Sequence, residues 1–233
     1  MRDSVQAVEF VAERLGSLAD QFVFLGGAVV GLLVTSPGAA RPRATRDVDL
    51  IVEVASRSEY QYGDNSLRAR LVERGFREAT DESVICRWVV GDVNVDIMDT
   101  AGEIFGFGNR WYPAAAAEAT SYRLNASSVV RLISPACFVA TKLEAFSGRG
   151  FGDYQASADI EDIVSVIEGR GTIEEDIASA SVEVRRFLSA EFDRLVNTPE
   201  FCDALPGHLP SDDASQSRLP DLLATLRKLS KID

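Results

Sequence analysis

The spacing of apolar residues changes along the chain, from a pattern typical of strands to one typical of helices. Residues 47–52 form an otherwise apolar run that contains Asp47 and Asp49, and in 88–97 apolar and polar residues alternate on both sides of Gly91-Asp92. Alternation predicts β-strands, and the Gly-Asp pair predicts a hairpin turn. From Ser134 onward apolar residues recur at helical spacing. The pattern therefore predicts an α+β fold, in which a mixed sheet with flanking helices is followed by a helical C-terminal region.

The change of period divides the chain into predicted domains. Residues 1–133 carry mixed strand and helix signals, and residues 134–204 are expected to form a helical domain. Residues 205–218 are polar and contain Pro, Gly and Ser, which favours a linker. Residues 219–233 contain a last amphipathic helix, and its leucines are expected to dock on the protein itself rather than on a partner.

Two acidic residues interrupt the first predicted strand. Asp47 and Asp49 are two positions apart, so both carboxylates lie on one face of the strand. Two like charges this close repel each other, and a bound divalent cation offsets that repulsion. A third carboxylate, Asp96, lies on a later strand and is expected to reach the pair. Oxygen ligands suit Mg²⁺, with Mn²⁺ as the alternative ion, so the sequence predicts a metal site at Asp47, Asp49 and Asp96.

A glycine pair precedes the acidic strand. Gly26 and Gly27 lie at a predicted junction between a strand and a helix, where backbone N–H groups can approach an anion. Alone, a glycine pair is also typical of an ordinary turn, and an Asp-x-Asp strand is also typical of a solvated face. The order of glycine pair, Asp-x-Asp and later Asp, each in its expected context, favours a nucleotide-and-metal site.

In this order the motifs resemble those of the nucleotidyltransferase superfamily related to polymerase beta. Within it, the chain is most similar to the AbiEii-type toxin family. The likeness rests on Gly26-Gly27-Ala28, on Arg43-x-Thr45-x-Asp47-x-Asp49, and on a downstream block from Ser134 to Asp162. The superfamily often has Gly-Ser where this chain has Gly26-Gly27, so a serine contact to phosphate is absent.

The resemblance implies nucleotide-binding roles for downstream residues. In the family a lysine and an Asp of an Asp-x-x-Asp helix line the nucleotide pocket, which implies these roles for Lys142 and for Asp159 or Asp162. Lys142 lies on the more polar side of a helix predicted to begin at Ser134-Pro135. A lysine in that position is also typical of a solvated face.

Several arginines lie close to the acidic strand. Arg43 and Arg46 precede Asp47, where guanidinium groups would either grip phosphates or neutralise the acidic pair. A local basic patch is also predicted on and after the next helix, and it consists of Arg68, Arg70, Arg74 and Arg77.

Composition narrows the function classes. The 233-residue chain has a net charge of −12, which disfavours broad nonspecific binding to nucleic acid. His208 is the only histidine, which disfavours Ser-His and Cys-His catalysis. The cysteines are odd in number and widely separated, which suits a reducing compartment. No signal peptide or membrane-spanning run is apparent, so we expect a cytoplasmic protein without a membrane partner.

Together these features predict a magnesium-dependent nucleotidyltransferase that moves an NMP from an NTP to an acceptor hydroxyl and releases pyrophosphate. In this scheme Asp47, Asp49 and Asp96 hold the metal, Asp96 helps to deprotonate the acceptor, and Lys142 offsets phosphate charge. The resemblance implies that the acceptor is tRNA and that an antitoxin accompanies the protein.

Three alternatives stay open at the level of sequence. One is transfer to a small molecule such as an aminoglycoside or a lincosamide, whose cationic character an acidic protein suits. The second is a protein acceptor. The third is a noncatalytic binding protein on the same fold, against which the presence of all three carboxylates counts.

Overall fold

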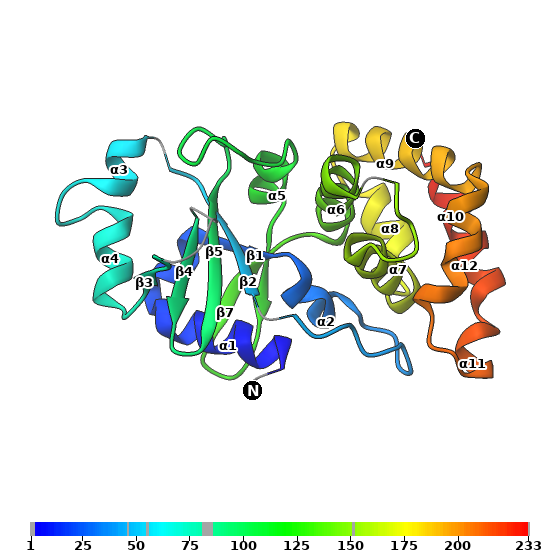
Figure 1. The fold of residues 1–233 in the computed structure, drawn as a ribbon, viewed down its shortest axis with the longest axis horizontal. Helices are drawn as coiled ribbons and strands as arrows, with labels where there is room; N and C mark the ends of the chain where they lie inside the picture. The colour runs from blue at the N-terminus through cyan, green and yellow to red at the C-terminus, as the bar shows by residue number, and fades with distance from the viewer. Residues whose placement is uncertain (1–2, 46, 55, 81–85, 151, 233) are drawn as a thin grey trace. The chain divides into compact units, whose positions relative to one another are not determined.

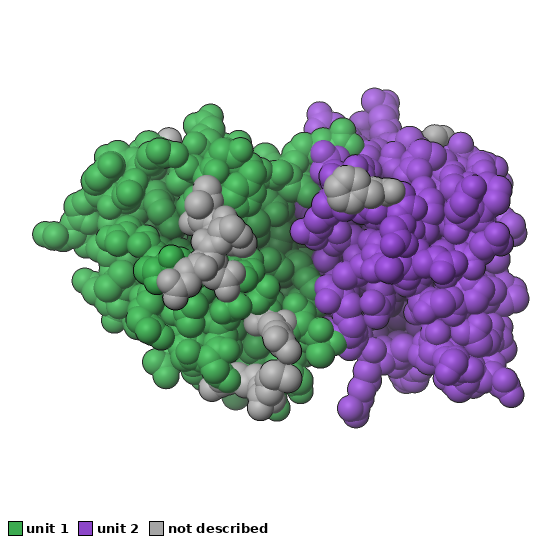
Figure 2. All heavy atoms as spheres, in the orientation of Figure 1, with its two compact units in different colours: residues 1–29, 44–133 green, residues 30–43, 134–233 purple. Residues whose placement is uncertain are grey.

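A computed structural model of the chain describes residues 3–45, 47–54, 56–80, 86–150 and 152–232 (Figure 1). Its contacts divide the chain into two units, which Figure 2 colours separately. Unit 1 consists of Met1–Val29 and Ala44–Ile133, and unit 2 consists of Val30–Arg43 and Ser134–Asp233. A short segment that precedes the acidic strand therefore belongs to the second unit, which the sequence did not predict.

Unit 1 is built on a mixed seven-stranded sheet with the strand order β3-β4-β5-β2-β1-β7-β6 (Figure 1). The pairs β2·β5 and β1·β7 are parallel, and the other neighbouring pairs are antiparallel. The strands are β1 (Phe22–Leu25), β2 (Asp47–Val52), β3 (Arg77–Glu78), β4 (Arg87–Val90), β5 (Val93–Asp99), β6 (Thr120–Arg123) and β7 (Val129–Leu132). The predicted hairpin joins β4 to β5. The predicted α+β fold is confirmed.

Short helices accompany the sheet in unit 1. They are α1 (Ser4–Leu15), η1 (Gly16–Gln21), η2 (Gly27–Val29), α3 (Arg57–Gln61), α4 (Leu67–Glu73) and α5 (Tyr112–Ala117), where η marks a 3₁₀-helix. The first helix begins with a capping box, because the Asp3 side chain accepts a hydrogen bond from the Gln6 N–H and the Gln6 side chain accepts one from the Asp3 N–H. Its buried face, which includes Val8 and Val11, contacts β2 and β5.

Unit 2 is helical in its described residues. Its helices are α2 (Val30–Leu33), α6 (Pro135–Arg149), α7 (Ala158–Gly169), α8 (Ile173–Ala178), α9 (Val182–Val196), α10 (Pro199–Ala204), η3 (Leu205–His208), α11 (Asp213–Gln216) and α12 (Leu219–Leu229). Helix α6 starts where the sequence predicts, since the Ser134 hydroxyl accepts a hydrogen bond from the Cys137 N–H and Pro135 occupies the first turn.

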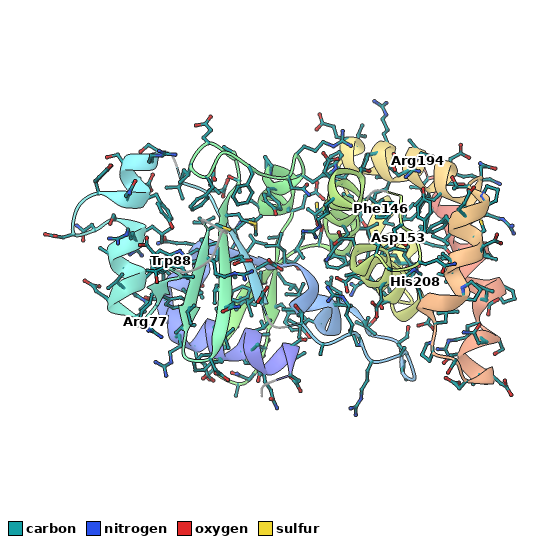
Figure 3. The ribbon with its side chains drawn as sticks, viewed as in Figure 1. Arg77, Trp88, Phe146, Asp153, Arg194 and His208 are labelled. Atoms are coloured by element: carbon teal, nitrogen blue, oxygen red, sulfur yellow. The ribbon has the colours of Figure 1, made fainter. Side chains whose placement is uncertain are left out.

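The segment 205–218, which the sequence analysis interprets as a linker, is structured. It contains η3 and α11, and both Leu205 and Leu209 are buried. Nε2 of His208 donates a hydrogen bond to the carbonyl oxygen of Tyr154 at 2.6 Å, and Figure 3 labels His208 beside α7. The two buried leucines explain the difference, because they anchor a segment whose remaining residues resemble a loop.

The last helix docks within unit 2, as the sequence analysis expects. Leu222, Leu226 and Leu229 lie on its buried face, and the helix contacts α7, α8 and α9. Leu226 and Leu229 are 0% exposed. Removal of this much apolar surface from water stabilises the helix in place.

We expect Leu226→Ala to lower the free energy of unfolding by about 2–4 kcal/mol, because the substitution leaves a cavity under α12. The matched control is Leu223→Ala in the same helix, where the side chain is only half-buried and the expected loss is about 1 kcal/mol. Urea denaturation followed by circular dichroism measures both. Equal losses would contradict the docking of α12 through its Leu226 face.

Candidate active site

The pairing of β2 with β5 brings three carboxylates to one face of the sheet. The two strands are parallel, and their register pairs Asp49 with Asp96 and Asp47 with Asn94. Residues paired across neighbouring strands point to the same face, as do residues two apart on one strand. Asp47, Asp49 and Asp96 therefore share a face. The opposite face is apolar and fully buried, and it carries Val48, Leu50, Val95 and Ile97.

Gly26 lies directly against the carboxylate of Asp49. β1 runs antiparallel to β2 and pairs Leu25 with Asp49, so the next residue follows close by. Gly26 has a φ of +73°, and a Cβ at this position would lie 1.8 Å from Oδ2 of Asp49. Only glycine fits here, for conformation and for space.

Gly27 begins η2, so the predicted junction between a strand and a helical segment is present. The helical segment is short, with three residues in η2 and four in α2. A short helix has few aligned peptide dipoles. Any anion bound at this junction would therefore depend on individual backbone N–H groups.

Arg87 on β4 donates hydrogen bonds to the carboxylates of Asp96 and Asp47. Its Nε and Nη2 donate hydrogen bonds of 2.8 Å to the two oxygens of Asp96, and Nη2 also donates to Oδ2 of Asp47 at 3.0 Å. Asn94 donates to the other oxygen of Asp47 at 3.1 Å. The side chains of Arg87 and Asp96 are 14% and 13% exposed, so the pair is shielded from most of the solvent.

The sequence analysis did not assign Arg87 to the site. A usable signal was present, because a tight hairpin at Gly91-Asp92 pairs Val90 with Val93 and hence Arg87 with Asp96. Counting back from the turn would have placed the guanidinium beside the third carboxylate.

The donor chemistry of this face suits a hard divalent cation, since three carboxylates share it and Gly26 leaves space beside Asp49. Their present hydrogen bonds serve a guanidinium instead. In the ranges that the structure describes, no three acidic, thiol or imidazole side chains are grouped so that they could hold a metal ion as they stand. The three carboxylates therefore suit Mg²⁺ in the type of ligand and in the face that they share. Binding of Mg²⁺ stays a prediction.

The thiol of Cys86 precedes Arg87 in the chain and is not a nucleophile. Burial, together with the smaller effect of the negative charge of Asp96, raises the pKa of Cys86 to about 12. The thiol therefore stays protonated near neutral pH. Cys137 is also buried, Cys202 is half-buried, and none of the three cysteines forms a disulfide bond.

Unit 2 contains a second group of charged residues, which we call the lysine–aspartate network. Nζ of Lys142 donates to Asp159 at 3.1 Å and to Asp162 at 2.7 Å. Arg43 donates two hydrogen bonds to Asp162, at 2.9 and 3.1 Å. Arg149 donates two to Asp159, at 3.0 and 2.9 Å. Lys142, Asp159 and Asp162 are 7%, 5% and 1% exposed, so two buried carboxylates are each shared by two cations.

This network changes the interpretation of two predicted residues. Lys142 is not solvated, because the carboxylates of α7 cover its side of α6. Arg43 binds Asp162 rather than serving as the counter-ion of Asp47, and Arg87 has that role. Arg46 lies outside the described residues. The nucleotide-binding roles of Gly26, Gly27, Arg43, Lys142, Asp159 and Asp162 stay predictions.

The charges of the network set the protonation of its members. Burial raises the pKa of Asp159, but the hydrogen bond from Arg149 and the charge of Lys142 together outweigh it, so the pKa lies below its ordinary value. For Arg43 burial lowers the pKa, and the hydrogen bond to Asp162 and its charge outweigh that effect and raise it. Both groups are therefore ionised near neutral pH.

Most of the predicted basic patch is engaged within unit 1. Arg68 donates to both carboxylate oxygens of Glu78, at 2.8 and 3.0 Å. Arg74 donates to the carbonyl oxygens of Leu15 and Arg70. Arg77 lies on the edge strand β3, where Figure 3 labels it. The patch is thus held largely by intramolecular contacts.

Comparison with solved structures identifies the fold. A crystal structure of an antigenic nucleotidyltransferase-like protein from Paracoccidioides brasiliensis matches with a TM-score of 0.54 and 23% identity, over 88% of this chain and 93% of that chain. The solution structure of the antibiotic-resistance factor ANT(2'')-Ia gives a TM-score of 0.45 and 16% identity, over 82% of this chain and 96% of that chain. The first likeness shows that this chain has a nucleotidyltransferase-like fold.

Other comparisons bear on family and location. No protein-family model matches the chain, and no curated protein matches its sequence. Within the described ranges, no helix combines the length and apolar character needed to cross a bilayer.

We expect Gly26→Ala to lower the free energy of unfolding by about 3 kcal/mol or more, because the new Cβ both strains the backbone and displaces Asp49. Gly75→Ala is the matched control, since Gly75 has a φ of +84° with nothing within 4 Å of an added Cβ. It should cost only the backbone strain, about 1–2 kcal/mol. Thermal and urea unfolding of both variants test this, and similar losses would show that the close approach to Asp49 is unimportant.

We expect the stabilisation by Asp159 to disappear in acid. The pKa of Asp159 is lower in the folded protein than in the unfolded chain, so its ionised form stabilises the fold above a pH of about 4. This contribution is lost as pH falls through the folded pKa. The difference in unfolding free energy between wild type and Asp159→Asn should thus be largest near neutral pH and shrink below a pH of about 4.

Urea denaturation across this pH range measures the difference. Asp64→Asn, at an exposed carboxylate, is the control and should show little effect at any pH. An Asp159→Asn effect that stays constant with pH would contradict the role of charge in the network.

Proposed function

We propose that the protein is a nucleotidyltransferase that moves a nucleoside monophosphate from an NTP to an acceptor hydroxyl. The acceptor oxygen bonds to the α-phosphorus, the bond from that phosphorus to the bridging oxygen breaks, and pyrophosphate leaves. The observation that carries this proposal is the in-register pairing of Asp49 with Asp96, with Asp47 on the same face and Gly26 packed against Asp49. The nucleotidyltransferase-like fold supports it.

The residues of unit 1 supply the acidic half of this chemistry. Asp47, Asp49 and Asp96 would hold Mg²⁺, or Mn²⁺ in its place. The bound ion supplies positive charge that offsets the charge on the triphosphate and on the leaving pyrophosphate. Asp96 is the carboxylate assigned to accept the proton of the acceptor hydroxyl. The backbone N–H groups at Gly26 and Gly27 would donate hydrogen bonds to the phosphates of the NTP.

For unit 2, the roles that we propose come from the family resemblance. We propose that Lys142 and Arg43 bind the nucleotide. Asp159 and Asp162 would orient these two side chains through the hydrogen bonds of the lysine–aspartate network. Because both carboxylates are almost fully buried, they hold these cations in fixed positions rather than in a range of solvated ones.

For the acceptor, we propose tRNA, with the protein acting as the toxin of a toxin-antitoxin system in the cytoplasm. Support comes from the resemblance to the AbiEii-type family. That resemblance rests on Gly26-Gly27-Ala28, on the motif from Arg43 to Asp49, and on the downstream block from Ser134 to Asp162. The cognate antitoxin is the second expected partner. The net charge of −12 makes general nucleic-acid affinity weak, so recognition would depend on local contacts.

Transfer to a cationic small molecule is the second candidate function. The acidic composition favours it, because a net negative surface attracts aminoglycosides and related cations. Both candidates use the same three carboxylates, so they differ in the acceptor and not in the transfer chemistry.

We expect purified protein with Mg²⁺ and one of the four α-labelled NTPs to label its acceptor, and Asp49→Asn to reduce the rate on the order of a thousandfold. The acceptors tested are total tRNA, cell protein, and a panel of aminoglycosides and lincosamides. Label on tRNA supports the toxin proposal, and label on a drug supports the second candidate.

The control for this assay is Asp64→Asn, which changes an exposed carboxylate outside the cluster. It should transfer at the wild-type rate. Full activity of Asp49→Asn would overturn the proposed mechanism. Failure to label any acceptor, together with failure to bind Mg²⁺-NTP in calorimetry, would favour a noncatalytic binding protein.

A further inference from the structure

Arg87 differs from Arg68, another arginine of unit 1, in the contacts that it makes. It reaches two carboxylates on two different strands, with both oxygens of Asp96 and one oxygen of Asp47 as acceptors. Arg68, by comparison, binds the single carboxylate of Glu78, and both of those side chains are more than two-fifths exposed. An exposed pair of that kind contributes little to stability. Arg87 is bound within a half-buried acidic cluster, where a charge has larger effects.

The guanidinium of Arg87 meets the same electrostatic need that a divalent cation would meet. Asp47 and Asp96 are like charges brought to one face by the β2·β5 register. A positive charge that bridges them offsets their repulsion. The planar fork of arginine matches the two oxygens of Asp96, so the carboxylate is held in one orientation.

A metal ion and Arg87 cannot use these oxygens independently. A hard cation binds carboxylate oxygens directly, and two positive charges so close together repel each other. Asn94 also holds the remaining oxygen of Asp47, so that carboxylate accepts hydrogen bonds at both oxygens. Within the described residues, no three acidic, thiol or imidazole side chains are grouped so that they could hold a metal ion.

We infer that Arg87 is a resident counter-ion that competes with the divalent metal for Asp47 and Asp96, and that metal binding requires its guanidinium to leave them. This inference rests on the proposed function, because it assumes that these carboxylates take a metal at all. Arg87 is a positioning residue in this scheme. It stabilises the cluster without metal and weakens the affinity of the cluster for metal.

Two consequences follow. The wild-type protein needs a higher metal concentration than its carboxylates alone would need, because each binding event must break the hydrogen bonds of Arg87. Removal of the guanidinium should affect the stability of the metal-free protein more than that of the metal-bound protein. The metal-free protein becomes less stable, since its carboxylates repel each other, and the metal-bound protein is affected less.

The test is titration of the full-length protein with Mn²⁺ alone, followed by the electron paramagnetic resonance signal of the free ion. We expect Arg87→Gln to bind Mn²⁺ at least about tenfold more tightly than wild type, since one charge-assisted hydrogen bond corresponds to a factor of about ten and Arg87 donates three to these carboxylates. Arg87→Lys, which keeps the charge but loses the fork, should lie between them. Arg68→Gln is the matched control and should leave the affinity unchanged.

Thermal unfolding supplies a readout that is independent of activity. Without metal, Arg87→Gln should melt below wild type, and saturating Mn²⁺ should raise its melting temperature by more than it raises that of wild type. Arg87→Lys retains a positive charge beside the carboxylates, so it serves as the test if Arg87→Gln does not fold.

The outcomes separate the inference from the proposed function. Tighter Mn²⁺ binding by Arg87→Gln, abolished when Asp96→Asn is added, supports the inference. Equal or weaker binding by Arg87→Gln, with saturable binding by wild type, overturns the inference and leaves the proposed function standing. Absence of saturable Mn²⁺ binding in wild type and in every Arg87 variant overturns both.

Discussion

Parallel pairing of β2 with β5 is the constraint on which the candidate site depends. The register sets Asp49 beside Asp96 and leaves Asp47 two residues away on the same face, while the apolar residues between them are buried on the other face. A shift of one residue would bury the carboxylates and expose the core. The register that builds the core therefore also collects the negative charges, and the protein needs a positive charge to offset their repulsion. Arg87 supplies it in this structure.

The lysine–aspartate network solves a similar problem in unit 2. Buried carboxylates are costly unless they are paired, and here Asp159 and Asp162 each bind two cations. The segment between the glycine pair and the acidic strand is tied to the same helix. Arg43 binds Asp162, and the N–H groups of Thr35 and Ser36 donate to the carbonyl oxygen of Gly169 at 2.9 Å. These contacts with α7 tie residues 30–43 to unit 2.

Local signals in the sequence predicted the elements well where a physical period or a cap was present. The hairpin at Gly91-Asp92, the acidic strand and the helix that starts at Ser134-Pro135 are all found in the structure. The prediction differed from the structure where composition was the only signal. Residues 205–218 look like a linker, but burial of Leu205 and Leu209 makes them part of unit 2. A few apolar anchors are difficult to recognise in a polar segment.

By itself, the sequence determined which residues share a face, because that depends on the period of a strand or a helix. Asp47 and Asp49 on one side of β2, and Asp159 and Asp162 within one helix, follow from spacing alone. Tertiary structure decided which charge meets which. Arg43 binds Asp162, and Lys142 is buried between two carboxylates instead of solvated. These pairings join residues more than fifteen positions apart, so packing of separate elements sets them, and no local period encodes that packing.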